Sequence, residues 1–148
     1  MSDPASTSAS PTRFECVVPI LRVTDLRASL RWYLVVLGFT KDWESGVMAQ
    51  VSRGRCPLML CEQDQGHVGG WVWFGVEDVT PLHEEYSAKG AEILLPPTYF
   101  SWAYEIRVED PDGNVLRFGS EPGRISRSPT RCPARSDTDS RLAPVRHG

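Results

Sequence analysis

The side chains that most often carry covalent or metal chemistry are few in this sequence and lie far apart. The three histidines fall in a loop, on a predicted helix and near the C-terminus, so they share no face (His67, His83, His147). The four cysteines form no Cys-x-x-Cys pair, and two of them lie five residues apart within one predicted strand (Cys16, Cys56, Cys61, Cys132). This pattern fits neither a zinc site nor a disulfide framework, so we expect reduced thiols.

Motifs of covalent catalysis are also missing. The sequence contains no Gly-x-Ser-x-Gly segment, no glycine-rich phosphate loop and no nucleophile with an obvious base. Cys61 could face a cleft, but no histidine or lysine near it in sequence would activate its thiol. These residues therefore favour a protein that binds a ligand over one that transforms it.

Aromatic side chains are the best candidates for ligand contact. The chain has five tryptophans, and three further aromatic residues cluster around the last of them (Trp32, Trp43, Trp71, Trp73, Trp102; Tyr99, Phe100, Tyr104). Flat aromatic faces stack on planar rings and attract cations. Trp71 and Trp73 lie two apart on a predicted strand, so they point to the same face. Asp42 stands beside Trp43 and could pair with a ligand cation.

Two similar runs of elements must position these residues. The first is predicted as a strand over 16–23, a helix over 26–37 capped by Asp25 and ended by Gly38, and strands over 39–43, 47–52 and 57–61. The second is predicted as a strand over 71–76, a helix beginning at Thr80-Pro81 with Thr80 as its cap and ended by Gly90, and strands over 91–94, 103–109 and 115–119. The segment Asp110–Asn114 is predicted as the turn between the last two strands.

The order strand, helix, three strands is therefore written twice. The six residues from Leu21 also match the six from Phe74, at an offset of 53. A repeat of this kind indicates two equivalent units that pack together. We predict an α+β fold in which two βαβββ modules form curled mixed sheets around a cleft, with the helices on the outer face.

The length of 148 residues fits one folded domain. We place it at 14–121, with modules at 14–62 and 70–121. Residues 1–13 and 122–148 have little to bury and are predicted to be disordered. No apolar run is long enough for a membrane span, and the N-terminus lacks the pattern of a secretory signal, so the expected location is the cytoplasm.

Charge is divided unevenly along the chain, whose net charge is −3. Residues 14–121 carry nine Lys and Arg against sixteen Asp and Glu, a balance of −7, whereas residues 122–148 carry six Arg against two Asp, a balance of +4. An acidic body argues against nucleic acid as the partner and is compatible with a cationic ligand.

The two modules resemble the vicinal oxygen chelate superfamily. The resemblance rests on LRVTDLRASLRWYLVVLGF in the first module and EDPDGNVLRFGSE at the end of the second, and it covers nearly all of residues 14–121. Within that superfamily, VVPIL, LGFTKDW, CEQDQ, WVWF and SWAYEIRVEDPDGN are similar, in this order, to segments of bleomycin resistance proteins. The resemblance implies a homodimer with two ligand crevices at the subunit interface. It also implies an N-terminal strand exchanged between partners, with Pro19 at the hinge.

Enzymes of the superfamily hold a divalent metal with His and Glu side chains. The resemblance places the four ligand positions of this chain on residues that lack such groups (Val18, Met59, Trp71 and Arg117). Valine, tryptophan and arginine do not coordinate these ions, so no metal and no other cofactor is expected. A metal-dependent glyoxalase, dioxygenase or thiol transferase is the weaker alternative.

The same resemblance implies a set of ligand-contacting residues. Trp43 and Trp102 match positions that line the drug crevice, and four further residues match other crevice positions (Met48, Cys61, Arg107, Gly113). The family ligand is a cationic glycopeptide with a flat ring pair. The expected function is therefore metal-independent sequestration of a bleomycin-type antibiotic, which confers resistance. Met48 and Cys61 depart from the family's usual aromatic and serine, so a small-molecule-binding accessory protein of antibiotic biosynthesis stays open as an alternative.

Overall fold

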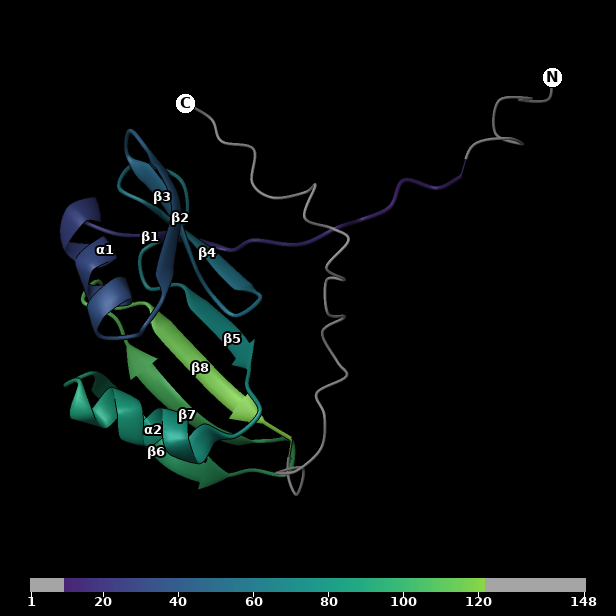
Figure 1. Ribbon diagram of the computed structural model, residues 1–148, viewed down its shortest axis with the longest axis vertical. Helices are drawn as coiled ribbons and strands as arrows, with labels where there is room; N and C mark the ends of the chain where they lie inside the picture. Colours follow the sequence, from purple (N-terminus) through teal and green to yellow (C-terminus); the bar gives the residue numbers. More distant parts are fainter. Residues whose placement is uncertain (1–9, 122–148) are drawn as a thin grey trace.

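Two four-stranded sheets, each carrying one helix, make up the computed structural model in Figure 1, which describes residues 10–121. The first module contains β1 (Ile20–Arg22), α1 (Leu26–Val35), β2 (Thr40–Ser45), β3 (Met48–Arg53) and β4 (Cys56–Cys61). The second contains β5 (Trp71–Gly75), α2 (Val79–Ala88), β6 (Glu92–Tyr99), β7 (Tyr104–Glu109) and β8 (Val115–Ser120). The predicted α+β fold with two βαβββ modules is confirmed.

Both sheets have the same topology. Their strand orders are β1-β4-β3-β2 and β5-β8-β7-β6. In each sheet the first and last strands of the module pair in parallel, and the other neighbours are antiparallel. Figure 1 shows both helices on the same side of the molecule, so each sheet has one face under its helix and one face without a helix. We call the second the open face.

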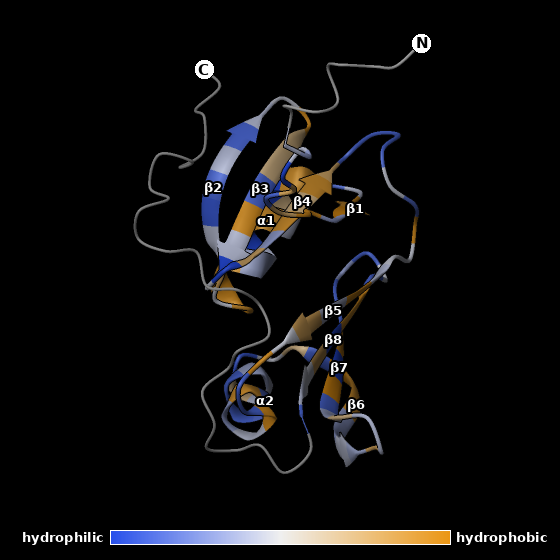
Figure 2. Ribbon diagram, turned by 90° about the vertical axis from the view of Figure 1, so that its right-hand side faces the viewer, coloured by the Kyte–Doolittle hydropathy of each residue, from blue (hydrophilic) through white to orange (hydrophobic). Residues whose placement is uncertain are grey.

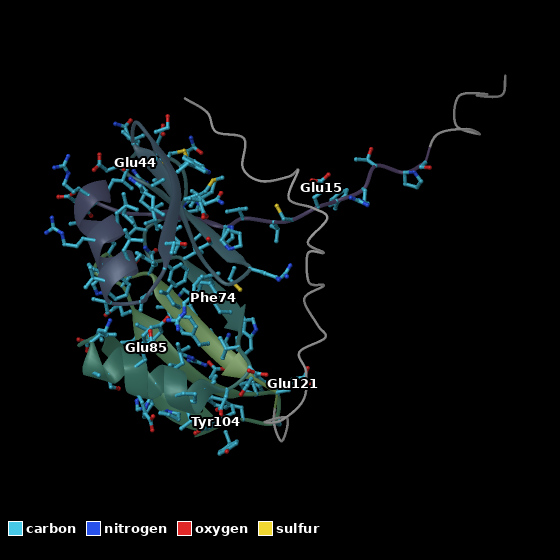
Figure 3. All side chains as sticks on the ribbon, viewed as in Figure 1. Glu15, Glu44, Phe74, Glu85, Tyr104 and Glu121 are labelled. Carbon is cyan, nitrogen blue, oxygen red and sulfur yellow. The ribbon has the colours of Figure 1, made fainter. Side chains whose placement is uncertain are left out.

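The strands alternate between these two faces. In the second sheet, Phe74, Leu116, Phe118, Ile106 and Val108 are buried on the helix side. In the first sheet, Figure 2 shows β2 mostly hydrophilic and β4 mostly hydrophobic, while β3 alternates between hydrophilic and hydrophobic residues. Apolar and polar residues that alternate along a strand sequence predict one buried face and one exposed face.

A row of aromatic rings joins the modules into one core. Tyr33 of α1 meets Phe39 edge to face at 5.9 Å, and Phe39 meets Phe74 of the second sheet in the same way at 5.9 Å. Phe74 then stacks on Phe118 at 4.8 Å, and Phe118 meets Tyr86 of α2 at 5.5 Å. Such ring pairs add to the stabilisation that burial alone provides, so the two modules pack as one unit.

The turn after β7 also ties the modules together. The Asp112 carboxylate accepts hydrogen bonds from the Thr24 backbone N–H (2.8 Å) and the Ser29 hydroxyl (2.9 Å) at the start of α1. Asn114 donates its side-chain amide to the backbone carbonyl of Arg22 at 3.0 Å. The predicted turn is therefore present, and its side chains also bind the start of the first module.

Most predicted boundaries lie within two residues of the observed ones, as at the ends of α1 and β2, but three predictions need correction. β1 begins at Ile20 rather than at residue 16, although the Pro19 carbonyl directly before it already accepts from the Met59 N–H of β4 at 2.9 Å. The cap of α2 is Asp78, whose carboxylate accepts from the Thr80 N–H at 3.0 Å, rather than Thr80 itself. β6 continues to Tyr99, well beyond the predicted end at residue 94. It passes through Pro96-Pro97 because the edge strand shifts register between Leu95 and Thr98, where ladder donors are not required.

The predicted disorder of residues 122–148 lies outside the described residues, as does most of the predicted N-terminal segment. Within residues 10–121, neither helix has the length and apolar content that a membrane crossing requires.

Candidate ligand-binding site

The open face of the second sheet gathers aromatic and charged side chains from three neighbouring strands. Trp73 pairs in register with Arg117 of β8, and Arg117 pairs with Arg107 of β7. Alternation along the strands places Trp71 and Glu105 on this same face. Trp71 and Trp73 remain 59% and 45% exposed, although both are large apolar groups.

Glu105 lies at the centre of this face and is fully buried. Arg117 donates to it twice, from Nε to Oε2 at 3.0 Å and from Nη2 to Oε1 at 2.9 Å. Arg107 donates from Nε at 2.8 Å, and the Trp102 indole N–H donates at 3.3 Å. The bonds from Arg117, assisted by those from Arg107 and Trp102, outweigh burial and lower the pKa of Glu105 to about 2. Glu105 is therefore an anion that fixes three neighbouring side chains.

The rings stand against the two guanidinium groups. The Arg117 guanidinium lies 5.1 Å from the centre of the Trp73 ring, and the Arg107 guanidinium lies 5.7 Å from that of Trp71. Phe100 approaches Arg107 at 5.9 Å. It also stacks on Trp102 with centres 4.6 Å apart and planes 10° from parallel. We name these side chains the second-sheet cluster: Trp71, Trp73, Phe100, Trp102, Glu105, Arg107 and Arg117.

A glycine pair makes room for one of the rings. Gly75 and Gly119 face each other in the ladder between β5 and β8. A Cβ atom built on Gly119 would lie 2.1 Å from the Trp73 ring, so this ring rests directly on the Gly119 backbone. The absence of a side chain at residue 119 thus lets Trp73 lie across the sheet with one side toward solvent.

The open face of the first sheet is more polar. A register shift between Lys41 and Trp43 sets both Asp42 and Trp43 near Gln50 of β3. The two carboxylate oxygens of Asp42 accept from the Gln50 amide (3.1 Å) and the Ser52 hydroxyl (2.9 Å). Trp43 beside it is half-buried. The proposed cation partner and its neighbouring ring therefore share one edge of this sheet.

Met48 and Cys61, two further predicted contact residues, are direct register partners on β3 and β4. Met48 is half-buried, and Cys61 is 1% exposed, so the thiol is covered within the single chain. Among the described residues, no hydrogen-bonded base accompanies this thiol.

The structure joins some predicted contact residues and separates another. Trp102 and Arg107 both donate to Glu105, so the structure places these two predicted contacts side by side. Gly113 lies in the turn at the far end of β7 and β8, with a positive φ of 85° and its N–H on the carbonyl of Asp110. It has no contact with the second-sheet cluster in the described chain.

Of the seven members of the second-sheet cluster, only Trp102 and Arg107 were predicted from the sequence as ligand contacts; the other five were not (Trp71, Trp73, Phe100, Glu105 and Arg117). The alternation Glu105-x-Arg107 was an available signal, because it places an acid and a base on one strand face. What the spacing could not reveal was that Arg117, on another strand, would share the same carboxylate.

The residues at the superfamily's metal positions do not fit a divalent ion. The Arg117 guanidinium is a cation already paired with Glu105, and Trp71 presents an indole ring to solvent. Met59 pairs with Ile20 between β4 and β1. Within residues 10–121, no three His, Cys, Asp or Glu side chains are placed to hold a metal.

Solved structures with this architecture come from several bacteria. The bleomycin-binding protein of bleomycin-producing Streptomyces verticillus, solved with copper(II)-bleomycin, is 26% identical, with a TM-score of 0.62 over 74% of this chain and 98% of that one. TioX from Micromonospora sp. ML1 is 23% identical, with a TM-score of 0.62 over 73% and 99%. A glyoxalase/bleomycin resistance protein/dioxygenase from Nocardioides is 18% identical, with a TM-score of 0.63 over 85% and 97%. No curated protein sequence matches this chain significantly.

The family assignment agrees with the duplicated fold. The family model described as Glyoxalase/Bleomycin resistance protein/Dioxygenase superfamily matches residues 14–118, which include both βαβββ modules. The chain therefore belongs to the glyoxalase/bleomycin resistance protein/dioxygenase superfamily.

Proposed function

We propose that this protein binds a planar aromatic antibiotic of the bleomycin type, sequesters it and leaves it chemically unchanged. The observation that carries this proposal is the exposed aromatic surface of the second sheet, where Trp71, Trp73 and Trp102 are 59%, 45% and 58% exposed. Large apolar rings held open to solvent in fixed positions are typical of binding surfaces. The likeness to a bleomycin-binding protein at 26% identity supports the choice of drug class.

The proposed contacts come from both sheets. Asp42, Trp43, Met48 and Cys61 would line one wall, with the Asp42 carboxylate facing a ligand cation. Trp102 and Arg107 would line the other wall, where the stacked Trp102 ring offers a flat face. Gly113 lies apart from them in the turn after β7 and would contact only a ligand that extends to that end of the sheet. Because the drug is only bound, resistance would follow from lowering its free concentration. A cytoplasmic location suits this role, since the protein would meet the drug after it enters the cell.

We further propose that the two walls of one crevice come from two copies of the chain. Support comes from the segment before β1, which Figure 1 shows running away from both sheets. Phe14 and Val17 in this segment are 94% and 84% exposed, so the single chain offers them no apolar contact. In the proposed homodimer they pack on the partner, and Pro19, directly before β1, is the hinge of the exchange.

Titration calorimetry and tryptophan fluorescence with metal-free and copper-loaded bleomycin test the drug assignment. A submicromolar Kd corresponds to more than about 8 kcal/mol of binding free energy. We expect Trp102→Ala to weaken binding at least tenfold. The control Trp32→Phe removes an indole from the helix side, where Trp32 meets Tyr33 edge to face, and should leave the Kd unchanged. If drug at tens of micromolar produced neither heat nor quenching of tryptophan fluorescence, the drug assignment would be wrong.

Two further measurements test the mechanism. Mass spectrometry of drug recovered from the complex should show an unaltered molecule. Elemental analysis of purified protein should find no stoichiometric zinc, nickel, manganese or iron, and finding one of these metals would overturn the proposal of metal-free binding.

A further inference from the structure

The two arginines of the second-sheet cluster keep hydrogen-bond donors that the protein does not use. Arg107 donates to Glu105 only through Nε, and Arg117 donates through Nε and Nη2. Within the described chain, both terminal nitrogens of Arg107 and Nη1 of Arg117 have no acceptor. Each arginine side chain is 27% exposed, so these donors point toward a region that a ligand can reach.

These donors are also fixed in position. Glu105 is fully buried and holds both guanidinium groups through their Nε atoms, while Trp71 and Trp73 lie against them at 5.7 and 5.1 Å. Arginine normally loses side-chain freedom when it binds an anion, and this cost falls when the guanidinium is already oriented. Binding of an anion to these two guanidinium groups therefore costs little side-chain entropy.

The charge of the cluster points the same way. Two arginines against Glu105 leave a balance of +1, opposite in sign to the acidic body of the chain. Glu109 lies on the same face of β7, but it makes no ion pair with either arginine among residues 10–121. The remaining positive charge of the pair is therefore available to a ligand.

We infer that the second sheet recognises a carboxylate attached to a planar aromatic ring. The carboxylate would accept from Arg107 and Arg117, and the ring would lie against the exposed tryptophans beside them. Guanidinium and carboxylate match in charge and in planar, two-point geometry. This inference rests on the proposed binding function. It defines the ligand more closely, because it requires an anionic group at the second sheet in addition to the cation expected near Asp42.

Three probes of equal size separate charge from ring stacking: 2-naphthoate, its neutral amide 2-naphthamide, and 2-naphthylmethylammonium. Binding to the full chain is followed by nitrogen–proton NMR of the Trp indole N–H and Arg Nε–H groups. Trp102, Arg107 and Arg117 donate these protons to Glu105, so they report directly on the site. We expect 2-naphthoate to bind at least tenfold more tightly than the other two probes and to shift the Arg107 and Arg117 signals.

Arg107→Gln should reduce the affinity for 2-naphthoate at least tenfold and leave that for 2-naphthamide nearly unchanged. Arg31→Gln is the matched control, because it removes the same charge from an exposed position on α1. Thermal unfolding of both variants verifies that they fold. If Arg31→Gln reduced the affinity for 2-naphthoate as much as Arg107→Gln does, the effect would come from net charge, and the inference would be wrong.

The other outcomes separate this inference from the proposed function. If all three probes bound equally and shifted the same tryptophan signals, or if bleomycin bound while none of the probes did, the carboxylate inference would fall and drug binding would stand. If neither the probes nor bleomycin bound, both proposals would fall together.

Discussion

Glu105 and Arg117 form a two-point ion pair diagonally across β7 and β8, with N–O distances of 3.0 and 2.9 Å. They are not register partners. Arg117 stands opposite Arg107, and Glu105 stands opposite Gly119. Two arginines directly opposite each other in a ladder repel, and the buried carboxylate offsets this by accepting from both. The glycine opposite Glu105 in turn leaves the space that Trp73 fills.

Glu105→Gln should therefore destabilise the fold, because it leaves two facing arginines without their anion. A carboxyl group whose pKa falls from 4.5 to about 2 on folding stabilises the folded state by about 3 kcal/mol at neutral pH. The folded pKa lies below the unfolded one. This stabilisation is therefore complete above pH 4.5 and disappears as the pH falls from 4.5 toward 2.

Urea unfolding of the wild type and the variant at pH 7 and at pH 3 measures this difference. The difference in free energy of unfolding between the two proteins should be large at pH 7 and smaller at pH 3. Glu84→Gln, at an exposed position on α2, serves as the control and should have little effect at either pH. A Glu105→Gln penalty of equal size at both pH values would contradict the ionic role.

Gly119→Ala tests whether the Trp73 ring depends on the bare backbone beneath it. The new Cβ would lie 2.1 Å from the ring, so Trp73 must move away from the sheet. We expect a loss of about 1–3 kcal/mol, as in overpacked sites, and a changed tryptophan emission spectrum. Gly75→Ala is the matched control, since its Cβ would meet the same ring at an ordinary 3.9 Å. In a Trp73→Ala background the Gly119→Ala penalty should vanish, and its persistence would place the clash elsewhere.

The sequence predicted the fold well because its signals were local and repeated. The helical spacing of α1 and its Asp25 cap were confirmed, with the Asp25 carboxylate accepting from the Ala28 N–H at 3.1 Å. The cap of α2 was misplaced because Asp78 and Thr80 are both good capping residues and lie two apart. The end of β6 was missed because Pro96-Pro97 reads as a break, whereas the edge strand accommodates both prolines in a register shift.

The binding surface was only partly predictable. The shared face of Trp71 and Trp73 followed from strand alternation, and the structure confirms it. The sharing of Glu105 by two arginines depends on the register between β7 and β8, which side-chain packing and turn geometry set. An isolated glutamate in an alternating strand reads as solvent-exposed, and its burial follows only from partners that are distant in sequence.

Tyr33→Phe tests the polar link between the modules. The Tyr33 hydroxyl donates to Asp110 at 2.7 Å, and both residues are buried. Burial, followed by the nearby charge of Asp110, raises the pKa of Tyr33 well above its usual value of 10. The folded pKa exceeds the unfolded one, so this stabilisation is present below pH 10 and is lost as the pH rises further.

The variant should unfold at lower urea concentration, with a loss of about 1–3 kcal/mol for a hydrogen bond to a buried charged group. Its stability should also fall less steeply than that of the wild type between pH 9 and 11. Tyr99→Phe is the control, since Tyr99 is 68% exposed and its ring stacks on Tyr104. Equal alkaline slopes for the wild type and Tyr33→Phe would show that another group causes the titration.

Phe14→Ser combined with Val17→Ser tests whether the N-terminal segment packs on a partner chain. Burying side chains of this size contributes about 1.5–3 kcal/mol each, and a symmetric dimer would contain two copies of both. Size-exclusion chromatography with light scattering should show a wild-type dimer and, in the double variant, dissociation at concentrations at least tenfold higher. The monomer should keep its circular dichroism spectrum, because the two side chains are 94% and 84% exposed in the single chain.

Val68→Ser removes an apolar group that is 77% exposed elsewhere and should leave the dimer intact. If the crevice has walls from two chains, drug affinity must fall together with dimer stability, and full drug binding by a monomer would place the whole site within one chain.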